Sequence, residues 1–205
     1  MASTQELEKP SGITGKLFLI VGPSGSGKGT VIEEIQQRYP GFVYPVSYTT
    51  REPREGELDG EVYHFISKEK FKAMIDNDEF LEYAIVHSDN YYGTSKSDIL
   101  DPLKGGAVVV REVDIQGFHS IRELVPKENL VSIFMKVSDL EDLRQRILRR
   151  GHIEEEELQR RLDSAQKELA LAKDCNYQVE NKWGAIWECV RSVIDIILDE
   201  IDELY

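Results

Sequence analysis

A glycine-rich loop directly follows a short apolar run, and this pair constrains the fold more than any other feature of the chain. Residues 17–21 read Leu-Phe-Leu-Ile-Val, the pattern of a strand that is buried on both faces of a parallel sheet. Residues 22–30 follow as Gly-Pro-Ser-Gly-Ser-Gly-Lys-Gly-Thr and meet the pattern G-x-x-x-x-G-K from Gly22 to Lys28. The order of strand, loop and helix predicts an α/β domain.

The residue types in this loop indicate phosphate binding. Glycines let several backbone N–H groups approach phosphate oxygens, the helix N-terminus adds positive partial charge, and Lys28 can reach the β- and γ-phosphates. We expect a nucleoside triphosphate to contact Gly22, Pro23, Ser24, Gly25, Ser26, Gly27, Lys28, Gly29 and Thr30. The alternative, a turn that only links a strand to a helix, stays open here, and the loop alone fixes neither substrate nor reaction.

Length and charge narrow the class of protein. With 205 residues and 40% hydrophobic residues, the chain can bury the core of one domain. A net charge of −13 argues against a general affinity for nucleic acid or anionic membrane. Cys175 and Cys189 lack metal-ligand spacing and are expected to be reduced packing residues. Because no leader and no membrane-spanning run is apparent, we expect a cytoplasmic protein.

Strand and helix patterns alternate along the chain, as in a parallel α/β sheet. Helices are expected at residues 30–39, 67–76, 114–124, 138–151, 154–173 and 187–204, and strands at 42–46, 62–66, 80–87, 107–110, 130–137 and 176–180. Residues 48–54 are expected to form a loop, and residues 47–93 an insert with its own small sheet. Ser138 and Glu141 have the spacing of a capping box.

A second group of residues suggests another phosphate site. Arg51 and Arg54 flank the turn-forming Pro53, and two guanidinium groups at this spacing suit one phosphate. By themselves these arginines could equally be solvated surface residues. The histidines, His64, His87, His119 and His152, match no catalytic motif.

The motifs around these arginines resemble those of the guanylate kinases. Residues 47–57 read Ser-Tyr-Thr-Thr-Arg-Glu-Pro-Arg-Glu-Gly-Glu, and then come Gly60-x-x-Tyr63-x-Phe65, Phe80-Leu-Glu82, Asn90-Tyr-Tyr92-Gly-Thr94 and Glu112-Val-Asp114-Ile-Gln-Gly117. The resemblance covers residues 16–198 and implies a P-loop NTPase-type parallel sheet core flanked by helices. It implies a core of residues 16–46, 94–137 and 167–198, a GMP-binding insert of 47–93 with a small mixed sheet, and a helical lid of about 138–166. Residues 1–15 would be a flexible tail and residues 199–205 the end of the last helix.

The resemblance also assigns the GMP site. It implies that Arg51, Arg54, Tyr63 and Tyr92 hold the GMP phosphate, that Ser47, Glu82, Thr94 and Asp114 surround the guanine, and that Glu57 also belongs to the GMP site. Chemistry agrees for Glu82, because one carboxylate can accept hydrogen bonds from guanine N1–H and N2, whereas the unprotonated N1 of adenine would repel it. Without the order of the motifs, Glu82 would be interpreted as a strand-edge carboxylate and the tyrosines as sheet aromatics.

For ATP, the resemblance implies a lid whose arginines reach the phosphates. The matching positions are Arg146, Arg150 and Arg161, which with Lys28 form the predicted catalytic set. The adjacent Arg149 and Arg160 could be matched to the same positions instead. The alternative is a basic helical face that pairs with residues 154–157. Asn181 resembles the family's adenine-contacting asparagine.

The implied reaction converts ATP and GMP, or dGMP, into ADP and GDP or dGDP by direct in-line transfer, and serves GMP recycling and GTP and dGTP supply. Gly29 departs from the family's usual Ser, so we expect Mg²⁺ to be held mainly by water and phosphates, with Thr30, Glu112 and Asp114 as candidate contacts. Arg111 replaces an apolar residue of the family, and the sequence supplies no account of it. The competing hypotheses are a nucleoside-monophosphate kinase of other base preference and a non-catalytic binding module. No nucleic-acid or membrane partner is expected. The oligomeric state stays open.

Overall fold

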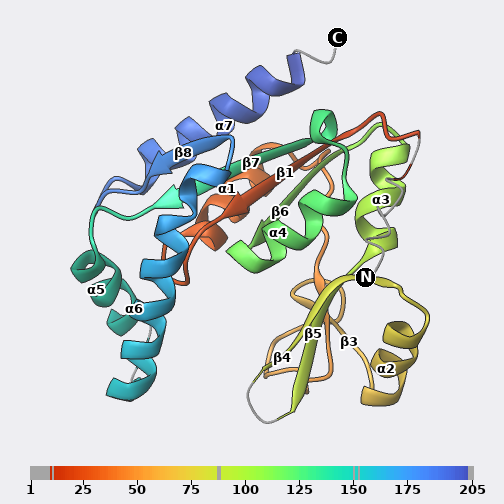
Figure 1. The fold of residues 1–205 in the computed structure, drawn as a ribbon, viewed down its shortest axis with the longest axis horizontal. Helices are drawn as coiled ribbons and strands as arrows, with labels where there is room; N and C mark the ends of the chain where they lie inside the picture. The colour runs from red at the N-terminus through yellow and green to blue at the C-terminus, as the bar shows by residue number, and fades with distance from the viewer. Residues whose placement is uncertain (1–9, 11, 87–88, 150, 152, 203–205) are drawn as a thin grey trace, which may run out of the picture.

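The protein is built around two separate sheets (Figure 1). The structure is a computed structural model that describes residues 10, 12–86, 89–149, 151 and 153–202. The first sheet has the order β6-β1-β7-β8, with β1 at Lys16–Val21, β6 at Val108–Val113, β7 at Leu130–Lys136 and β8 at Tyr177–Glu180. All three strand pairs are parallel, and their connections carry helices, as parallel pairing requires.

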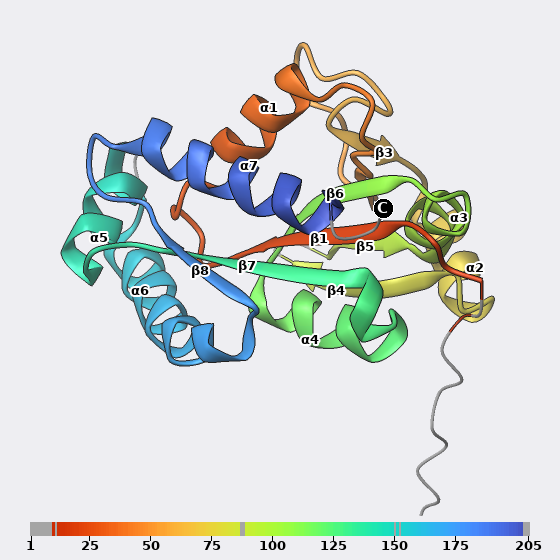
Figure 2. The ribbon, with the colours of Figure 1, turned by 90° about the horizontal axis from the view of Figure 1, so that it is seen from above.

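Helices cover both faces of this sheet (Figure 2). Phe18 and Ile20 of β1 pack on one face in a cluster with α1 (Lys28–Arg38) and α7 (Ile186–Asp202). Leu17, Leu19 and Val21 pack on the other face in a cluster with α3 (Lys96–Lys104) and α4 (Ile115–Leu124). All six residues of β1 are buried, which confirms the prediction of a strand buried on both faces.

The second sheet lies apart from the first, at the lower right of Figure 1. Its order is β3-β2-β5-β4, with β2 at Ser47–Thr49, β3 at Tyr63–Phe65, β4 at Phe80–Val86 and β5 at Asn90–Ser95. The β2–β3 pair is parallel and the pairs involving β5 are antiparallel, so the sheet is mixed. Helix α2 (Lys68–Asp76) packs Phe71 and Met74 against Phe80 of β4. The predicted α/β class, a parallel sheet plus a separate mixed sheet, is confirmed.

Two helices project at the opposite end of the first sheet from the second one (Figure 1). Helix α5 (Leu140–Arg149) and α6 (Glu155–Ala170) share an apolar cluster that includes Leu143, Ile147 and Leu158. Short 3-10 helices occur at Lys127–Asn129 and Ala172–Asp174. The division of the chain into core, insert and lid stays a prediction, as does the tail of residues 1–15.

The strand predicted at residues 42–46 is wrong. Only one isolated bridge, between Val43 and Val109, forms in this segment. Pro45 has no N–H to donate, and Tyr39 and Phe42 stack with their ring centroids 5.2 Å apart, so their side chains serve the core instead of a ladder. The strand begins at Ser47 as β2, and therefore the loop predicted for residues 48–54 is wrong at its first two positions.

Other boundaries also differ from the sequence predictions. The cap of α5 is Asp139, whose Oδ1 accepts from the N–H of Asp142 at 2.7 Å, so the box predicted at Ser138 is wrong. Glu141 instead accepts from Gln145 Nε2 at 2.8 Å. Helix α6 ends at Ala170, and a 3-10 turn replaces the rest of the predicted helix 154–173. Helix α3 and strand β5 were not predicted.

The cysteines behave as packing residues. Cys175 and Cys189 are both free and buried, and burial raises the pKa of each thiol to about 11. His87, His152 and Arg150 lie outside the described residues. Within the described ranges, no helix combines the length and the apolar character that a membrane crossing needs.

Candidate active site

The glycine-rich loop leaves β1 and enters α1 through a left-handed turn. Gly27 caps α1 with φ of 98°, a conformation that side chains other than glycine's rarely adopt. A Cβ at Gly22 would lie 2.8 Å from the carbonyl oxygen of Met135, so only glycine fits beside β7. Lys28 Nζ donates to the carbonyl oxygens of Gly22 at 2.6 Å and Pro23 at 3.1 Å, which holds its ammonium over the loop.

Asn181 ties this loop to the end of β8. Its side chain is almost fully buried, and its Nδ2 donates to the carbonyl oxygen of Ser26 at 2.8 Å. Its backbone N–H donates to the carbonyl oxygen of Lys136, and its carbonyl oxygen accepts from Arg146 Nη2 at 2.7 Å. Asn181 therefore joins the loop, β7 and α5 in one network.

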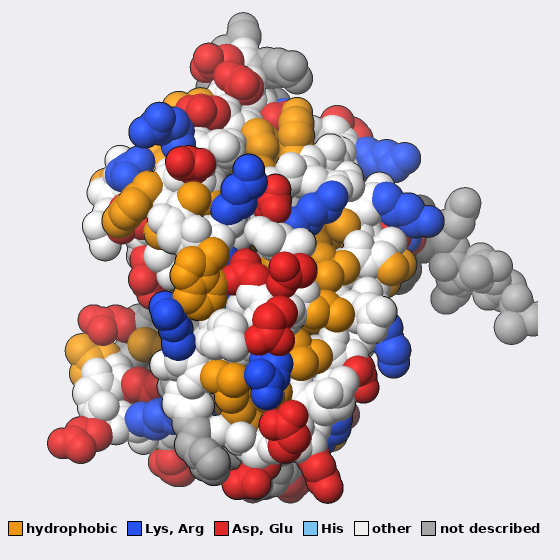
Figure 3. Space-filling view, turned by 90° about the vertical axis from the view of Figure 1, so that its left-hand side faces the viewer, with side chains coloured by type: hydrophobic (Ala, Val, Ile, Leu, Met, Phe, Trp, Pro, Cys, Tyr) orange, Lys and Arg blue, Asp and Glu red, His pale blue; other side chains and the backbone are white. Residues whose placement is uncertain are grey.

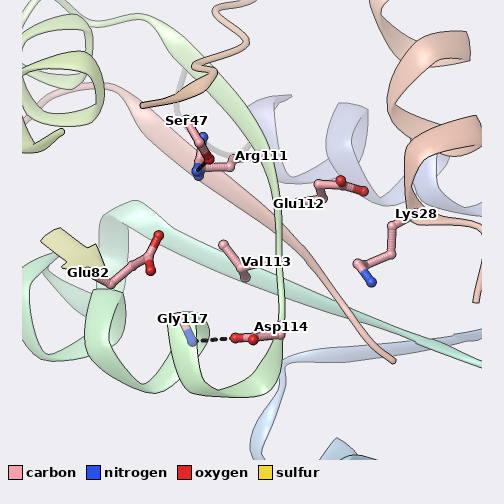
Figure 4. Close-up of a pocket in the computed structure, with 8 residues that line it drawn as sticks. All are labelled: Lys28, Ser47, Glu82, Arg111, Glu112, Val113, Asp114 and Gly117. Atoms are coloured by element: carbon pink, nitrogen blue, oxygen red, sulfur yellow. Dashed lines mark hydrogen bonds between the residues drawn. The ribbon is translucent and has the colours of Figure 1, made fainter. Parts of the chain in front are cut away.

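A cavity of about 210 Å³ lies between the two sheets (Figure 4). Its lining residues come from the loop, from β2 and β4 of the second sheet, and from β6 and the start of α4; they are Lys28, Ser47, Glu82, Arg111, Glu112, Val113, Asp114 and Gly117. Asp114 caps α4 by accepting the N–H of Gly117 at 2.8 Å, which fixes its carboxylate at the cavity wall. Lys28, Ser47, Glu82 and Asp114, predicted from separate motifs, thus meet at one cavity.

Arg111 connects the second sheet to the floor of this cavity. Arg111 is only 7% exposed to solvent, and its Nη1 donates to the carbonyl oxygen of Pro45 at 2.7 Å. Its Nη2 donates to Ser47 Oγ at 2.9 Å and makes a short bond to Thr94 Oγ1. Burial lowers the pKa of Arg111, and the charges of Glu82 and Glu112 oppose that shift.

Thr94 and Glu82 are cross-strand neighbours. The register of β4 and β5 places them opposite each other, and Thr94 Oγ1 donates to Glu82 Oε1 in a short hydrogen bond. Thr94 is fully buried, whereas Glu82 lines the cavity. This pairing brings together two predicted site residues that are separated along the chain.

The predicted phosphate arginines lie beside aromatic rings. Arg51 Nη2 donates to both carboxylate oxygens of Glu57, at 3.1 and 2.8 Å, and its guanidinium lies 5.4 Å from the ring centroid of Tyr63. Tyr63 and Tyr92 meet edge to face at 5.6 Å. The hydrogen bond from the Arg54 backbone N–H lowers the pKa of Glu57, burial opposes it, and the hydrogen bond from Arg51 adds to the lowering. Arg54 itself is exposed.

Comparison with known proteins places these motifs in a family. A family model described as guanylate kinase matches residues 14–195. A guanylate kinase of Clostridium tetani is 44% identical over 186 residues, which cover 91% of this chain and 86% of that protein. One of Clostridioides difficile is 44% identical over 168 residues, covering 82% and 80%. The chain belongs to the guanylate kinase family.

A solved relative agrees with the fold of this guanylate kinase. The crystal structure of guanylate kinase from Anaplasma phagocytophilum superposes with a TM-score of 0.68 at 27% identity, covering 93% of this chain and 87% of that one. The chain is an enzyme with guanylate kinase activity on this relationship, and the family implies ATP and GMP as substrates. The hypotheses of another base preference and of a non-catalytic module lose their support.

A further cavity on this guanylate kinase lies on the other side of the glycine-rich loop. Gly25, Gly27, Thr30, Arg146, Arg149, Asn181, Lys182, Trp183, Gly184 and Ile186 line it. The guanidinium of Arg149 lies 4.4 Å from the Trp183 ring centroid and that of Arg146 lies 5.6 Å from it. Arg146 also pairs with Asp142, with Nε 3.0 Å from Oδ1. The sequence interpretation missed Trp183, although a tryptophan two residues after Asn181 was a visible signal.

Arg161 is not brought into these cavities. Its Nε donates to Glu157 Oε1 at 2.8 Å on the same helix, the pairing that the alternative interpretation expected. Figure 3 shows the face that carries α5 and α6, where basic and acidic side chains lie intermixed. Among the predicted phosphate-binding residues of the second sheet, Arg51, Arg54, Tyr63 and Tyr92 likewise line neither of these two cavities.

The donor set beside the loop suits a weakly held Mg²⁺. Glu112 and Asp114 line the cavity with Lys28, and a Cβ at Gly29 would lie 3.9 Å from Glu112 Oε2. A hydroxyl at position 29 would therefore face this carboxylate, and its absence leaves room for water. Among the described residues, no three His, Cys, Asp or Glu side chains gather into a metal cage. One or two carboxylates completed by phosphates and water is an arrangement that Mg²⁺ accepts.

Proposed function

We propose that this guanylate kinase transfers the γ-phosphoryl group of ATP directly to the phosphate of GMP or dGMP. The observation that carries the proposal is the single cavity that Lys28 of the loop shares with Ser47 and Glu82 of the second sheet. The phosphoryl donor, ATP at the loop, and the phosphoryl acceptor, GMP at the second sheet, would then bind at the same cavity. The product would be ADP with GDP or dGDP.

The guanine is proposed to bind at the wall formed by Ser47, Glu82, Thr94 and Asp114. Glu82 Oε1 accepts from Thr94 and keeps a second acceptor site, so both carboxylate oxygens can still serve the base. Guanine presents N1–H and N2–H side by side, so one carboxylate can accept from both. A site of this kind can reject an analogue that lacks these donors by roughly 10⁴-fold, because its carboxylate would stay unpaired.

The GMP phosphate is proposed to bind at Arg51, Arg54, Tyr63 and Tyr92. The contact of Arg51 with Glu57 and with the ring of Tyr63 supports this assignment, because it fixes the guanidinium before a phosphate arrives. Glu57 would act by orienting Arg51, since its carboxylate is already occupied. The exposed Arg54 can turn to the phosphate from the opposite side.

ATP is proposed to bind along the loop, with Lys28 near the β- and γ-phosphates. Its adenine would lie in the cavity lined by Asn181, Arg146 and Trp183. Arg146, Arg150 and Arg161 would supply positive charge to the phosphates once the segment around α5 and α6 closes, which for Arg161 requires release from Glu157. Mg²⁺, held by phosphates and water with Glu112, Asp114 or Thr30 nearby, would neutralise phosphate charge.

In this mechanism no covalent enzyme intermediate forms. A phosphate oxygen of GMP attacks the γ-phosphorus, the new O–P bond forms, and the bond to the bridging oxygen of ADP breaks. The attacking oxygen is already anionic, so the residues of the chain contribute mainly position and positive charge. Lys28 would stabilise the negative charge that develops on the transferring phosphoryl group. Closure of the cavity would exclude water.

A coupled assay of ADP release tests the proposal. ATP and Mg²⁺ are offered with GMP, dGMP, AMP, CMP or UMP, and turnover is expected with GMP and dGMP alone. Lys28→Met should reduce kcat by at least about 10²-fold, and Glu82→Gln should raise the KM for GMP while leaving the KM for ATP unchanged. Chelation of Mg²⁺ should stop turnover.

Charge-matched variants remote from both cavities serve as controls. Lys173→Met and Glu128→Gln change exposed residues and should leave turnover at the wild-type rate. Turnover with AMP at a rate comparable to GMP would contradict the assignment of Glu82, and turnover by Lys28→Met at the wild-type rate would contradict the assignment of the loop. The predictions of a cytoplasmic location and of no nucleic-acid or membrane partner remain with the proposal, and the oligomeric state stays open.

A further inference from the structure

Arg111 is a buried cation on strand β6. Three valines, Val108 to Val110, precede it on the strand, and the exposed Glu112 follows it before Val113. Removing a guanidinium from water costs several kcal/mol unless its hydrogen bonds are well satisfied. Among the described residues, Arg111 Nε is buried without a hydrogen-bond partner. A gain in folding stability is therefore a poor explanation for a guanidinium at this position.

The bonds of Arg111 fix the direction of two hydroxyl protons. A guanidinium only donates, so Ser47 Oγ and Thr94 Oγ1 must accept from its Nη2. Each hydroxyl has one proton of its own to place. Thr94 donates its proton to Glu82 Oε1, which uses one acceptor site of that oxygen. Ser47, one of whose two lone pairs accepts from Arg111, keeps its own proton to donate elsewhere, and Ser47 lines the cavity.

The cavity wall therefore presents a donor at Ser47 beside an acceptor at Glu82. Guanine carries the complementary edge, an acceptor at O6 next to donors at N1 and N2. Adenine carries the reverse pattern at positions 6 and 1, a donor followed by an acceptor. Without Arg111, the Ser47 hydroxyl could rotate and accept from a 6-amino group.

We propose that Arg111 is a positioning residue that sets Ser47 as a hydrogen-bond donor and Glu82 as an acceptor, and so selects 6-oxopurine nucleotides. The inference rests on the proposed guanine site. Arg111 would act through Ser47 and Thr94 and would not itself touch the base. The same charge lies near Glu82 and Glu112, where it offsets the two carboxylates at the cavity.

Equilibrium binding of base analogues tests this role. Calorimetry compares GMP with 2-aminopurine riboside monophosphate, which lacks both O6 and the N1 proton, and with AMP, for the wild-type protein and for Arg111→Met and Arg111→Lys. The wild-type protein should prefer GMP to the 2-aminopurine nucleotide by about 10²-fold or more. Arg111→Met should reduce that preference at least about tenfold and leave ATP binding unchanged, and Arg111→Lys should restore part of it, because it keeps one donor.

A double-mutant cycle separates this role from a structural one. In the Ser47→Ala background, Arg111→Met should change the ratio of the two dissociation constants by less than it does in the wild-type protein, because only the path through Thr94 remains. Arg38→Met, at an exposed arginine on α1, controls for loss of charge and should leave the ratio unchanged. Equal weakening of GMP and the 2-aminopurine nucleotide by Arg111→Met would overturn the inference, as would additive effects in the cycle.

Two outcomes remain distinguishable from failure of the proposed function. If Arg111→Met does not fold, Arg111→Lys still decides, since an unchanged ratio in that variant together with additivity in its own cycle with Ser47→Ala would overturn the inference. If GMP binds with the expected ratio but is not phosphorylated, the proposed reaction fails while the role of Arg111 stands. If GMP does not bind, both fail.

Discussion

Gly27 shows how one missing side chain maintains the phosphate loop. Its φ is 98°, and a Cβ placed on it would lie 2.6 Å from Asn181 Nδ2, the group that holds the carbonyl oxygen of Ser26. Alanine at this position would meet both backbone strain and a polar neighbour that cannot retreat without losing its bond. The glycine is therefore required by the contact to β8 as well as by the turn.

Gly27→Ala should disable ATP binding and weaken the fold together. Strain of this kind costs about 1–3 kcal/mol, which for a chain of this size lowers Tm by roughly 2–10 °C. The KM for ATP should rise at least tenfold while GMP binding by calorimetry is retained. Gly41→Ala, at a position with open space and no positive φ, is the matched control. Wild-type ATP binding by Gly27→Ala would show that the loop can relax without cost.

At the residue scale, the sequence allowed a prediction wherever a structural or chemical requirement can be met by one residue type only. The glycine loop could be predicted because phosphate contact and positive φ both demand glycine, and the arginine pair could be predicted from its motif. Arg111 could not be assigned, because its role depends on hydroxyls from β2 and β5 that only the fold brings within reach. The contact of Trp183 was missed for the same reason, since Trp183 lies in a turn before α7 and its partner Arg149 lies at the end of α5.

At the scale of elements, an ion pair with little solvent exposure joins the first strand, β1, to the last helix, α7. Lys16 at the start of β1 donates from Nζ to Glu200 Oε2 and to the Glu200 carbonyl oxygen of α7, each at 2.6 Å. Tyr177 of β8 donates to Glu200 Oε1 at 2.9 Å. Burial alone would raise the pKa of Glu200, but the hydrogen bonds from Lys16 and Tyr177 outweigh it and lower the pKa.

Glu200→Gln should therefore destabilise the protein in a pH-dependent way. At pH 7 the free energy of unfolding should fall by about 1.5–3 kcal/mol, since Lys16 is left buried without its counter-charge. Because the pKa of Glu200 is lower in the folded state, the contribution is full above the unfolded value of about 4.3 and is lost as the pH falls through the folded value. Urea unfolding of both proteins between pH 3.5 and 8 measures the difference.

The control and the contrary outcome of this experiment are simple. Asp195→Asn removes an exposed carboxylate from the same helix and should change stability by no more than about 0.5 kcal/mol at any pH. A difference between wild type and Glu200→Gln that persists unchanged at pH 3.5 would mean that the charge of Glu200 is not what stabilises the contact.

Elements with a strong apolar pattern could be predicted, and those held by distant partners could not. Strands β1 and β7 are rich in apolar residues, with only Ser132 interrupting the run from Leu130 to Met135, and both were predicted within a residue at each end. Helix α3 was missed because Pro102 in its last turn and its short length hide the buried pair Ile99 and Leu103. The false strand at 42–46 had a suitable composition but no neighbour beyond Val109 with which to continue pairing.

At the scale of the whole molecule, the base cavity depends on two sheets that share no strand. Glu82 and Ser47 belong to the second sheet, whereas Asp114 follows β6 of the first. The hydrogen bonds of Arg111 to Ser47 and Thr94 cross between the sheets, and Leu81 of β4 packs in the core cluster of the first sheet. A nucleotide bound in the cavity would add a further connection between them. The motifs could predict which residues serve GMP, but no pattern along the chain determines how the sheets face each other.

Hydrogen exchange with each nucleotide should separate the two halves of the site. GMP at about 100 times its Kd stabilises the bound state by about 2.7 kcal/mol, so exchange should slow in β4 and β5 and also in residues 111–117. A non-hydrolysable ATP analogue should instead slow exchange in residues 22–30. Glu82→Gln should abolish the effect of GMP on both sheets and keep the effect of the analogue, because the loop does not depend on Glu82. If GMP protects β4 and β5 but leaves residues 111–117 unchanged in the wild-type protein, the base does not bridge the sheets, and Asp114 must be removed from the guanine site.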